Sequence, residues 1–172
     1  DIRNKRVKPD QDNMLKITTD GRKAALDMRL VDLIFGRESD SKVMRCAENI
    51  ADVYYDTRDT NSIQLVFCDI STPKEGFNLY NELKSLLIAM GIPGNKIAFI
   101  HEANTEARKK ELFSKVRSGQ VRVLMGSTFK MGAGMNVQDR LVALHDLDAR
   151  WTPGDPEPRS GRIPRHASRA PR

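Results

Sequence analysis

A chain of 172 residues, 39% of them hydrophobic and 30% charged, can bury one core and has the composition of a soluble domain. No apolar run approaches the roughly 20 residues that span a bilayer, and no signal peptide is recognisable, which predicts a cytoplasmic protein without a membrane partner. The net charge of +6 owes most to residues 159–172, whose five arginines, taken from 29 basic residues, leave 24 against 23 acidic ones. Charge alone therefore does not predict nucleic-acid binding.

The first part of the chain is predicted to be irregular and then helical. After a polar start of about a dozen residues, a helix is expected over 20–35 with Gly36 as its stop, and a second helix over 41–57. The expected caps are Thr19 or Asp20 for the first helix and Asp40 or Ser41 for the second. The apolar faces expected to be buried consist of Leu26, Leu30, Leu33 and Ile34 in the first helix and of Val43, Cys46, Ala47, Ile50, Val53 and Tyr54 in the second.

Strands and helices then alternate along the chain. Strands are predicted at 63–68, 97–100, 121–125 and 141–147, and helices at about 76–90 and after an Asn104 cap. Gly91 and Gly119 are expected to end these helices. The alternation predicts an α/β domain with a mostly parallel sheet, helices packed on its faces and two helices ahead of it. Such sheets bind their ligands in loops beyond the carboxyl ends of the strands.

The cysteines and histidines predict no metal or redox chemistry. Cys46 and Cys68 fall within a predicted helix and a predicted strand, and are expected to be buried and reduced rather than joined in a disulfide. No Cys or His pair has the spacing of metal ligands, so no metal site is predicted. His101 and His145 are interpreted as hydrogen-bonded residues at strand ends rather than as catalysts.

Residues 121–153 carry the strongest functional signal. Two apolar runs, VRVLMG and LVALHDLD, enclose a polar loop that contains Ser127, Thr128, Lys130, Gly132, Gly134 and Asn136. Such a loop at the edge of an α/β sheet is typical of phosphate handling. The spacing GAGMNV lacks the third glycine of a dinucleotide fingerprint, so a Rossmann domain is a weaker alternative. The two glycines are also compatible with simple turns, and Lys130 with a solvated charge.

Several segments, in chain order, resemble the motifs of superfamily-two helicases in their second RecA-like lobe. QLVFCDIST resembles motif IV, and IHEANTEARKKELFSKVRSGQVRVLMGST resembles the core that leads into motif V. GSTFKMGAGMNVQ resembles motif V as Swi/Snf-type translocases have it, LDARWTPGD the Trp-x-Pro stretch that follows it, and PRSGRIPR motif VI. The pattern is similar to the helicase region of large bacterial, phage and conjugative-element proteins that often join a DNA methylase to a helicase.

The resemblance implies a domain organisation and a set of site residues. It implies an irregular and helical extension over 1–60, a RecA-like lobe over 61–155, and an altered motif VI with a basic, disordered tail over 156–172. Arg162 and Arg165 would be the catalytic, phosphate-facing arginines. Gly132, Gly134 and Asn136 would bind the nucleotide. The nucleic-acid backbone would be contacted by Ser71, Thr72, Lys74, Thr128 and Lys130. Trp151 would either anchor packing or position motif VI.

The resemblance also implies a cofactor and partners. The cofactor would be ATP, with Mg²⁺ held by a missing amino-terminal lobe, because the sequence contains no Gly-x-x-x-x-Gly-Lys-Ser/Thr loop and no Asp-Glu-x-His-like motif. DNA, that lobe and a linked methyltransferase domain would be the partners, and the chain alone is expected to bind ATP weakly and to hydrolyse none. Pro156, Pro158 and Pro164 are unsuited to the helix that normally presents the motif VI arginines. The alternative is a non-catalytic RecA-like module that binds nucleic acid or protein.

Overall fold

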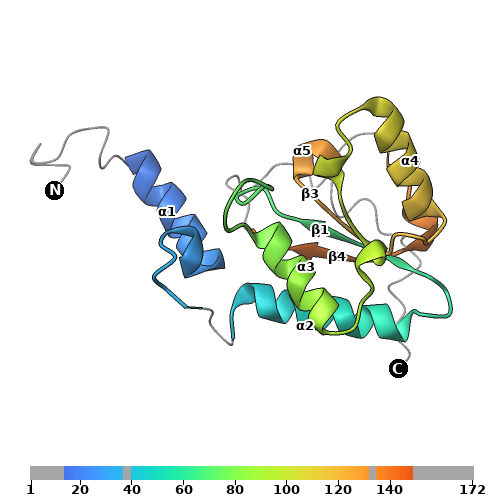
Figure 1. The fold of residues 1–172 in the computed structure, drawn as a ribbon, viewed down its shortest axis with the longest axis horizontal. Helices are drawn as coiled ribbons and strands as arrows, with labels where there is room; N and C mark the ends of the chain where they lie inside the picture. The colour runs from blue at the N-terminus through green and yellow to red at the C-terminus, as the bar shows by residue number, and fades with distance from the viewer. Residues whose placement is uncertain (1–13, 37–39, 132–134, 149–172) are drawn as a thin grey trace, which may run out of the picture.

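The computed structural model describes residues 14–36, 40–131 and 135–148, which form a sheet with helices around it (Figure 1). Within these residues the sheet has four strands in the spatial order β2-β3-β1-β4, and all three pairings are parallel. The strands are β1 (Ile63–Phe67), β2 (Ile97–Phe99), β3 (Val123–Gly126) and β4 (Leu141–Asp146). The predicted α/β class is therefore confirmed, and the arrangement agrees with a RecA-like parallel sheet that two helices precede.

Helices cover both faces of the sheet. One face packs against α2 (Lys42–Asp56) and α3 (Leu79–Ala89), and the other against α4 (Glu106–Arg117) and the one-turn helix α5 (Thr128–Met131). Side chains of β1 alternate between the two cores: Leu65 and Phe67 pack on the side of α4, and Val66 packs on the side of α2. The central strands β1 and β3 are buried along their whole length, as expected for strands covered on both faces.

Side-chain caps determine where α2 and α4 begin. Ser41, one of the two residues expected to cap α2, accepts a hydrogen bond from the backbone N–H of Met44 at 3.2 Å. The predicted cap of α4, Asn104, is wrong by one residue. Thr105 takes that place, because its hydroxyl accepts from the backbone N–H of Arg108 at 3.2 Å.

Gly91 and Gly119 follow α3 and α4, as predicted. Their φ angles are +91° and +76°, in the left-handed region that residues with a Cβ rarely adopt. A Cβ on Gly119 would also lie 2.8 Å from the carbonyl oxygen of Asn61. Both conformation and space therefore require glycine at the end of α4.

The first helix differs from the prediction. The helix α1 (Met14–Leu26) begins and ends earlier than 20–35, and a short 3-10 helix, η2 (Met28–Leu30), follows it. Asp27 explains the break, because its carboxylate accepts a hydrogen bond from the backbone N–H of Arg29 at 2.9 Å. A side chain that satisfies a nearby backbone N–H competes with the continuous helix.

The residues after η2 are exposed. Leu33 and Ile34, expected on a buried helical face, are 65% and 83% exposed, so this prediction is wrong. Gly36 does not end a helix either, because helical structure stops several residues earlier. Leu26, by contrast, is buried in the core shared with α2 and α3, as predicted.

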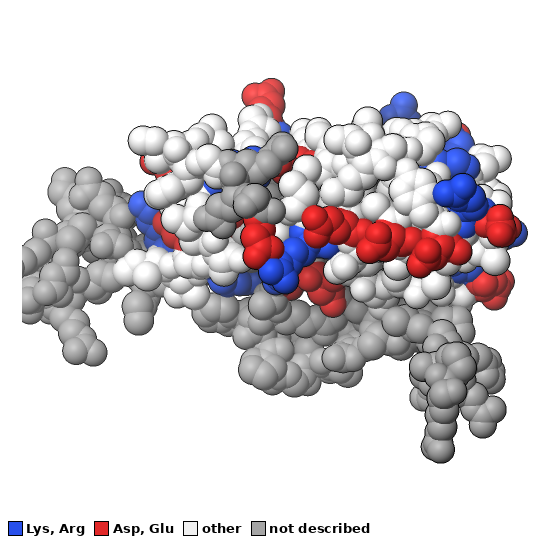
Figure 2. Space-filling model, turned by 90° about the horizontal axis from the view of Figure 1, so that it is seen from below, with Lys and Arg blue, Asp and Glu red and all other residues white. Residues whose placement is uncertain are grey.

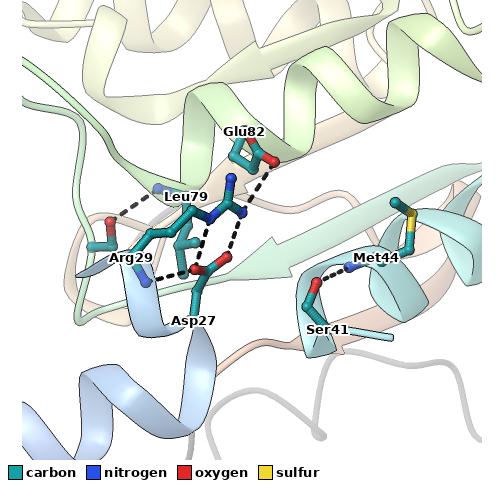
Figure 3. A network of polar contacts seen from close by, with 7 residues as sticks. Asp27, Arg29, Ser41, Met44, Leu79 and Glu82 are labelled. Carbon is teal, nitrogen blue, oxygen red and sulfur yellow. Dashed lines mark hydrogen bonds and ion pairs between the residues drawn. The ribbon is translucent and has the colours of Figure 1, made fainter. Parts of the chain in front are cut away.

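An ion-pair network attaches η2 to α3 (Figure 3). One guanidinium nitrogen of Arg29 lies 2.6 Å from a carboxylate oxygen of Asp27 and 3.1 Å from one of Glu82. The guanidinium also lies over the ring of Phe77, 4.5 Å from its centroid. Hydrogen bonding to Asp27 raises the pKa of Arg29 above its ordinary value. These charged side chains are largely buried, so the loss of any one of them would leave an unpaired buried charge. The contact between the amino-terminal segment and the sheet domain therefore depends on all three.

The outer face of α2 carries an acidic stripe, defined by Glu48, Asp52 and Asp56. All three are exposed and lie about one helical turn apart. In the view from the side of α2, acidic side chains form a row across the surface (Figure 2). Such a row repels phosphate groups, so a nucleic acid is not expected to bind on this face.

The two cysteines are buried free thiols. Cys46 and Cys68 are buried and form no disulfide, as predicted, although Cys68 directly follows β1 instead of lying within it. Burial raises the pKa of both thiols to about 12, so they are neutral and unreactive at neutral pH.

Among the helices of the described residues, none combines the length and the apolar character needed to cross a membrane.

Candidate nucleic-acid interface

The carboxyl ends of the parallel strands meet at one edge of the sheet, named here the carboxyl edge. Residues 68–78 follow β1, 100–103 follow β2, 127–131 follow β3 and 147–148 follow β4. Open α/β sheets bind their ligands at this edge. The side chains that these four segments contribute therefore define the candidate site.

Asp69 and Thr128 connect the ends of β1 and β3. The backbone N–H and the hydroxyl of Thr128 both donate to the carboxylate of Asp69, at 2.6 Å to Oδ1 and 2.6 Å to Oδ2. Both bonds are strengthened by the charge of the acceptor. They hold the first turn of α5 against the loop after β1, although 59 residues separate the two partners in the chain.

Asp148 connects the end of β4 to the same loop. Its Oδ2 accepts hydrogen bonds from the backbone N–H groups of Asp69 at 2.5 Å and of Ile70 at 2.7 Å. The residue is only 4% exposed, and two donors compensate for the loss of water around its carboxylate. Asp69 is therefore the centre of a network that joins β4, β1 and β3. Within the described residues, no group of three or more His, Cys, Asp or Glu side chains could hold a metal ion.

The loop after β1 is supported from inside. Ser71 is 3% exposed, and its hydroxyl oxygen accepts a hydrogen bond from the backbone N–H of Leu79 at 3.0 Å. The hydroxyl of Tyr80 donates to the carbonyl of Cys68 at 2.7 Å, and the side-chain amide of Asn78 donates to backbone carbonyls within the loop. The side chain of Ser71 therefore maintains the loop and is not exposed for the predicted contact with a nucleic acid.

Met131 packs the helix α5 against the sheet. Met131 is fully buried, and it approaches β3 so closely that a Cβ on Gly126 would lie 2.5 Å from its Cγ. The same Cβ would lie 2.5 Å from a methyl carbon of Ile100. Gly126 is therefore needed for the close packing of α5 on the end of β3. On the outside of this turn, Lys130 is exposed and the side chain of Phe129 is 92% exposed.

His101 lies at the end of β2, close to α5. Its ring packs edge-on against the ring of Tyr80, with 5.3 Å between the centroids. Burial, and to a lesser extent the positive charge of Lys130, lower its pKa, so the ring is neutral at neutral pH. Its Nδ1 is buried without a hydrogen-bond partner among the described residues.

His145 lies within β4 and has a structural contact. Its Nε2 lies 2.9 Å from Oε1 of Gln64, and the fully buried side chain of Gln64 donates to the carbonyl of Ile50 at 3.0 Å. This chain of hydrogen bonds links β4 through β1 to α2. The interpretation of His145 as a hydrogen-bonded strand residue is confirmed.

The structure brings part of the predicted site together. Four predicted residues lie on the loops after β1 and β3, at the carboxyl edge, with Ser71 buried beneath them: Thr72, Lys74, Thr128 and Lys130. Asn136 is exposed and lies between α5 and the 3-10 helix η5 (Gln138–Arg140). Outside the described residues lie Gly132, Gly134, Trp151, Arg162 and Arg165, together with the predicted tail over 156–172.

Three residues of this edge are missing from the sequence prediction. Asp69 and Asp148 each follow an apolar strand within two residues, a position that could have marked them as groups at the carboxyl edge. Phe129 had a weaker signal, namely an aromatic residue between the hydroxyl and lysine residues of a polar loop. Its near-complete exposure could not be read from that pattern.

Comparison of the chain with protein-family models, with characterised proteins and with solved structures found no match.

Proposed function

We propose that this chain is the second RecA-like lobe of an ATP-dependent DNA helicase or translocase. In this proposal the carboxyl edge contacts the backbone of one DNA strand. Arg162 and Arg165 would face the γ-phosphate of ATP, and an amino-terminal lobe of the same protein would hold the nucleotide and its Mg²⁺. Guanidinium groups suit this role, because they pair with phosphate oxygens and keep their charge throughout the reaction.

The contact between Asp69 and Thr128 carries the proposal. Asp69 belongs to the segment that resembles helicase motif IV, and Thr128 belongs to the segment that resembles motif V. Two hydrogen bonds of 2.6 Å join them at the carboxyl edge. Segments that bind one ligand must lie close together, and this contact meets that requirement.

The chemistry of the exposed groups supports a phosphate ligand. Lys74 and Lys130 are exposed on the two joined segments, and Thr72 is half-buried beside them. Lysine ammonium groups on a fixed support neutralise backbone phosphates without reading the base sequence. The acidic stripe on α2 disfavours phosphates on that other face (Figure 2). The segments of the carboxyl edge also carry the exposed carboxylates of Asp69, Glu75 and Glu102, so Lys74 and Lys130 support a local phosphate contact and do not make the whole edge positive.

Titration of a fluorescein-labelled single-stranded DNA at several salt concentrations tests the nucleic-acid part of the proposal. We expect a variant that combines Lys74→Ala and Lys130→Ala to bind more weakly. We also expect the negative slope of log association constant against log salt concentration to become shallower by about 1.4, because each phosphate contact to a single strand contributes roughly −0.7. The matched control combines Lys96→Ala and Lys115→Ala. The backbone carbonyls of these two lysines accept hydrogen bonds near the start of β3, at the opposite edge of the sheet.

Two results would contradict the nucleic-acid part. One is a wild-type chain that binds no DNA, and the other is an unchanged salt slope after both edge lysines are removed. The alternative function, a non-catalytic RecA-like module that binds nucleic acid or protein, shares the DNA-binding result only where its partner is DNA. It differs in ATP turnover, which depends on Arg165 only in the motor.

A further inference from the structure

Phe129 is an apolar ring in a polar setting. At 92% exposure it is the most exposed of the large hydrophobic residues in the described part of the chain. It lies on α5 at the carboxyl edge, directly between Thr128 and Lys130. Scattered apolar residues are common on protein surfaces, so exposure alone indicates nothing. What distinguishes Phe129 is the support beneath it and the groups beside it.

The backbone that carries Phe129 is held on both sides. On one side the N–H and the hydroxyl of Thr128 are bound to Asp69 at 2.6 Å each. On the other side Met131 is fully buried against β3, and its N–H donates to the carbonyl of Ser127 at 3.0 Å. A ring on such a support is presented to solvent in a defined place. Binding therefore requires no ordering of the loop that carries the ring.

The surroundings of the ring favour a nucleobase over a protein partner. Its neighbours on α5 are the half-buried Thr128 and the exposed Lys130, so the ring does not belong to a continuous apolar patch along that helix. Protein interfaces are built around contiguous apolar surface. Single-stranded nucleic acids, by contrast, are bound by isolated aromatic rings beside cationic groups, because a base stacks on the ring while its phosphate meets the cation.

We propose that Phe129 is a stacking platform for an unpaired base of the DNA strand, a proposal that rests on the function proposed above. Neighbouring residues on a helical turn point in different directions, so the ring of Phe129 and the ammonium of Lys130 address different parts of one nucleotide. Bases inside a duplex are already stacked on each other. The carboxyl edge is therefore selective for single strands, and this selectivity is tolerant of base sequence because every base has a face that stacks.

Parallel titrations of the full chain with a labelled single strand and with the matching duplex, at low salt, test the proposal. We expect Phe129→Ala to weaken single-strand binding about tenfold, the loss typical of one stacked base, and to change duplex binding much less. Phe129→Trp keeps a stacking ring and is expected to retain the affinity. The emission of the introduced tryptophan, after subtraction of the wild-type signal from Trp151, is expected to be quenched by the single strand.

Phe129→Leu and a remote control complete the design. Leucine is apolar but cannot stack, so we expect it to resemble Phe129→Ala. Ile88→Ala removes another exposed apolar side chain, 48% exposed on α3, and is expected to leave binding unchanged. Since Phe129 contributes little to the core, thermal unfolding of its variants should match that of the wild type.

The outcomes separate this inference from the function on which it rests. If the wild type binds the single strand but Phe129→Ala binds it equally well, stacking is excluded and the proposed function is untouched. Retention of affinity by Phe129→Leu also overturns stacking, and points to an apolar contact such as a protein interface. Equal losses on single strand and duplex overturn the selectivity for unpaired bases. If the wild type binds neither, the nucleic-acid function fails as well.

Discussion

Asp69 uses its carboxylate and its backbone N–H to hold three strand ends at once. The carboxylate binds Thr128, and the backbone N–H binds Asp148, so one residue sets the distance between the loops after β1, β3 and β4. The arrangement explains how a one-turn helix keeps its place without a long hydrophobic face. It also makes the position of Thr128 depend on a residue that belongs to another motif-like segment.

Replacement of Asp69 by alanine is expected to loosen the start of α5. Both donors of Thr128 lose their acceptor, and because Asp69 is exposed the free energy of unfolding in urea should fall by only about 1 kcal/mol. The sharper measurement is amide hydrogen exchange, in which the N–H of Thr128 should exchange faster in Asp69→Ala. Asp52→Ala, on the exposed face of α2, is the control and should leave this exchange rate unchanged. Unaltered exchange at Thr128 in Asp69→Ala would contradict the proposed tether.

The neutral state of His145 predicts a pH dependence of stability. Burial lowers the pKa of His145 in the folded chain from the ordinary value of 6.5, and the unfolded chain keeps that ordinary value. Between the two pKa values the unfolded state binds more protons, so the free energy of unfolding should decrease as the pH falls below about 6.5. Urea unfolding at a series of pH values measures the decrease.

His145→Gln separates this histidine from other titrating groups. Glutamine retains a polar side chain near Gln64 but has no proton to gain in this range, so the decrease in stability should be shallower than in the wild type. The pKa of His101 is lowered in the same direction, and it should account for part of the slope that remains. Identical pH profiles for the wild type and His145→Gln would show that His145 does not resist protonation in the fold.

At the scale of the elements, Arg122 fastens the end of α2 to the sheet. It is 2% exposed, and its guanidinium donates to the carbonyls of Ser62 at 3.0 Å, Tyr54 at 2.9 Å and Thr57 at 3.0 Å. The guanidinium carbon also lies 4.0 Å from the centroid of the Tyr54 ring. The last carbonyls of a helix have no partners within the helix, and a cation is a favourable partner for them.

Arg122→Met fills a similar volume but leaves these carbonyls without their donor. We expect a loss of roughly 3 kcal/mol in the free energy of unfolding, because buried acceptors without a partner cost about 1–3 kcal/mol each and partial rearrangement recovers some of it. Arg140→Met is the matched control. Arg140 makes one exposed hydrogen bond, to the carbonyl of Thr60 at 2.9 Å, so its loss should cost about 0.5 kcal/mol or less. Equal losses in the two variants would argue against the role of Arg122.

Elements that depend on local sequence could be predicted, whereas features that depend on particular side-chain contacts could not. Strand β3, VLMG, is a continuous apolar run and β1, IQLVF, is apolar apart from Gln64, so both could be predicted from local sequence. The end of α1 could not, because it depends on the carboxylate of Asp27 turning back to Arg29. The contact between Asp69 and Thr128 could not be predicted either. It requires β1 and β3 to be neighbours, and local patterns do not contain the strand order.

At the scale of the whole molecule, the positions of exposed charged side chains bear on where a nucleic acid can approach. The acidic stripe of Glu48, Asp52 and Asp56 covers the outer side of α2 (Figure 2), whereas the exposed Lys74 and Lys130 lie at the carboxyl edge. A phosphate backbone is repelled by the first surface, whereas at the second Lys74 and Lys130 attract it locally, beside the acidic side chains of Asp69, Glu75 and Glu102. We expect the bound DNA strand to run along the carboxyl edge, across the loops after β1 and β3.

ATP turnover in the presence of DNA, measured with the amino-terminal lobe supplied, tests the proposed motor function most directly. Arg165→Ala should lower DNA-stimulated turnover by about a hundredfold or more, since arginines that reach the transferred phosphate contribute roughly 10³ to 10⁵ in rate. Arg172→Ala, outside the segment that resembles motif VI, should leave turnover unchanged. Turnover that is equally fast in the wild type and in Arg165→Ala would contradict the motor and favour a binding module.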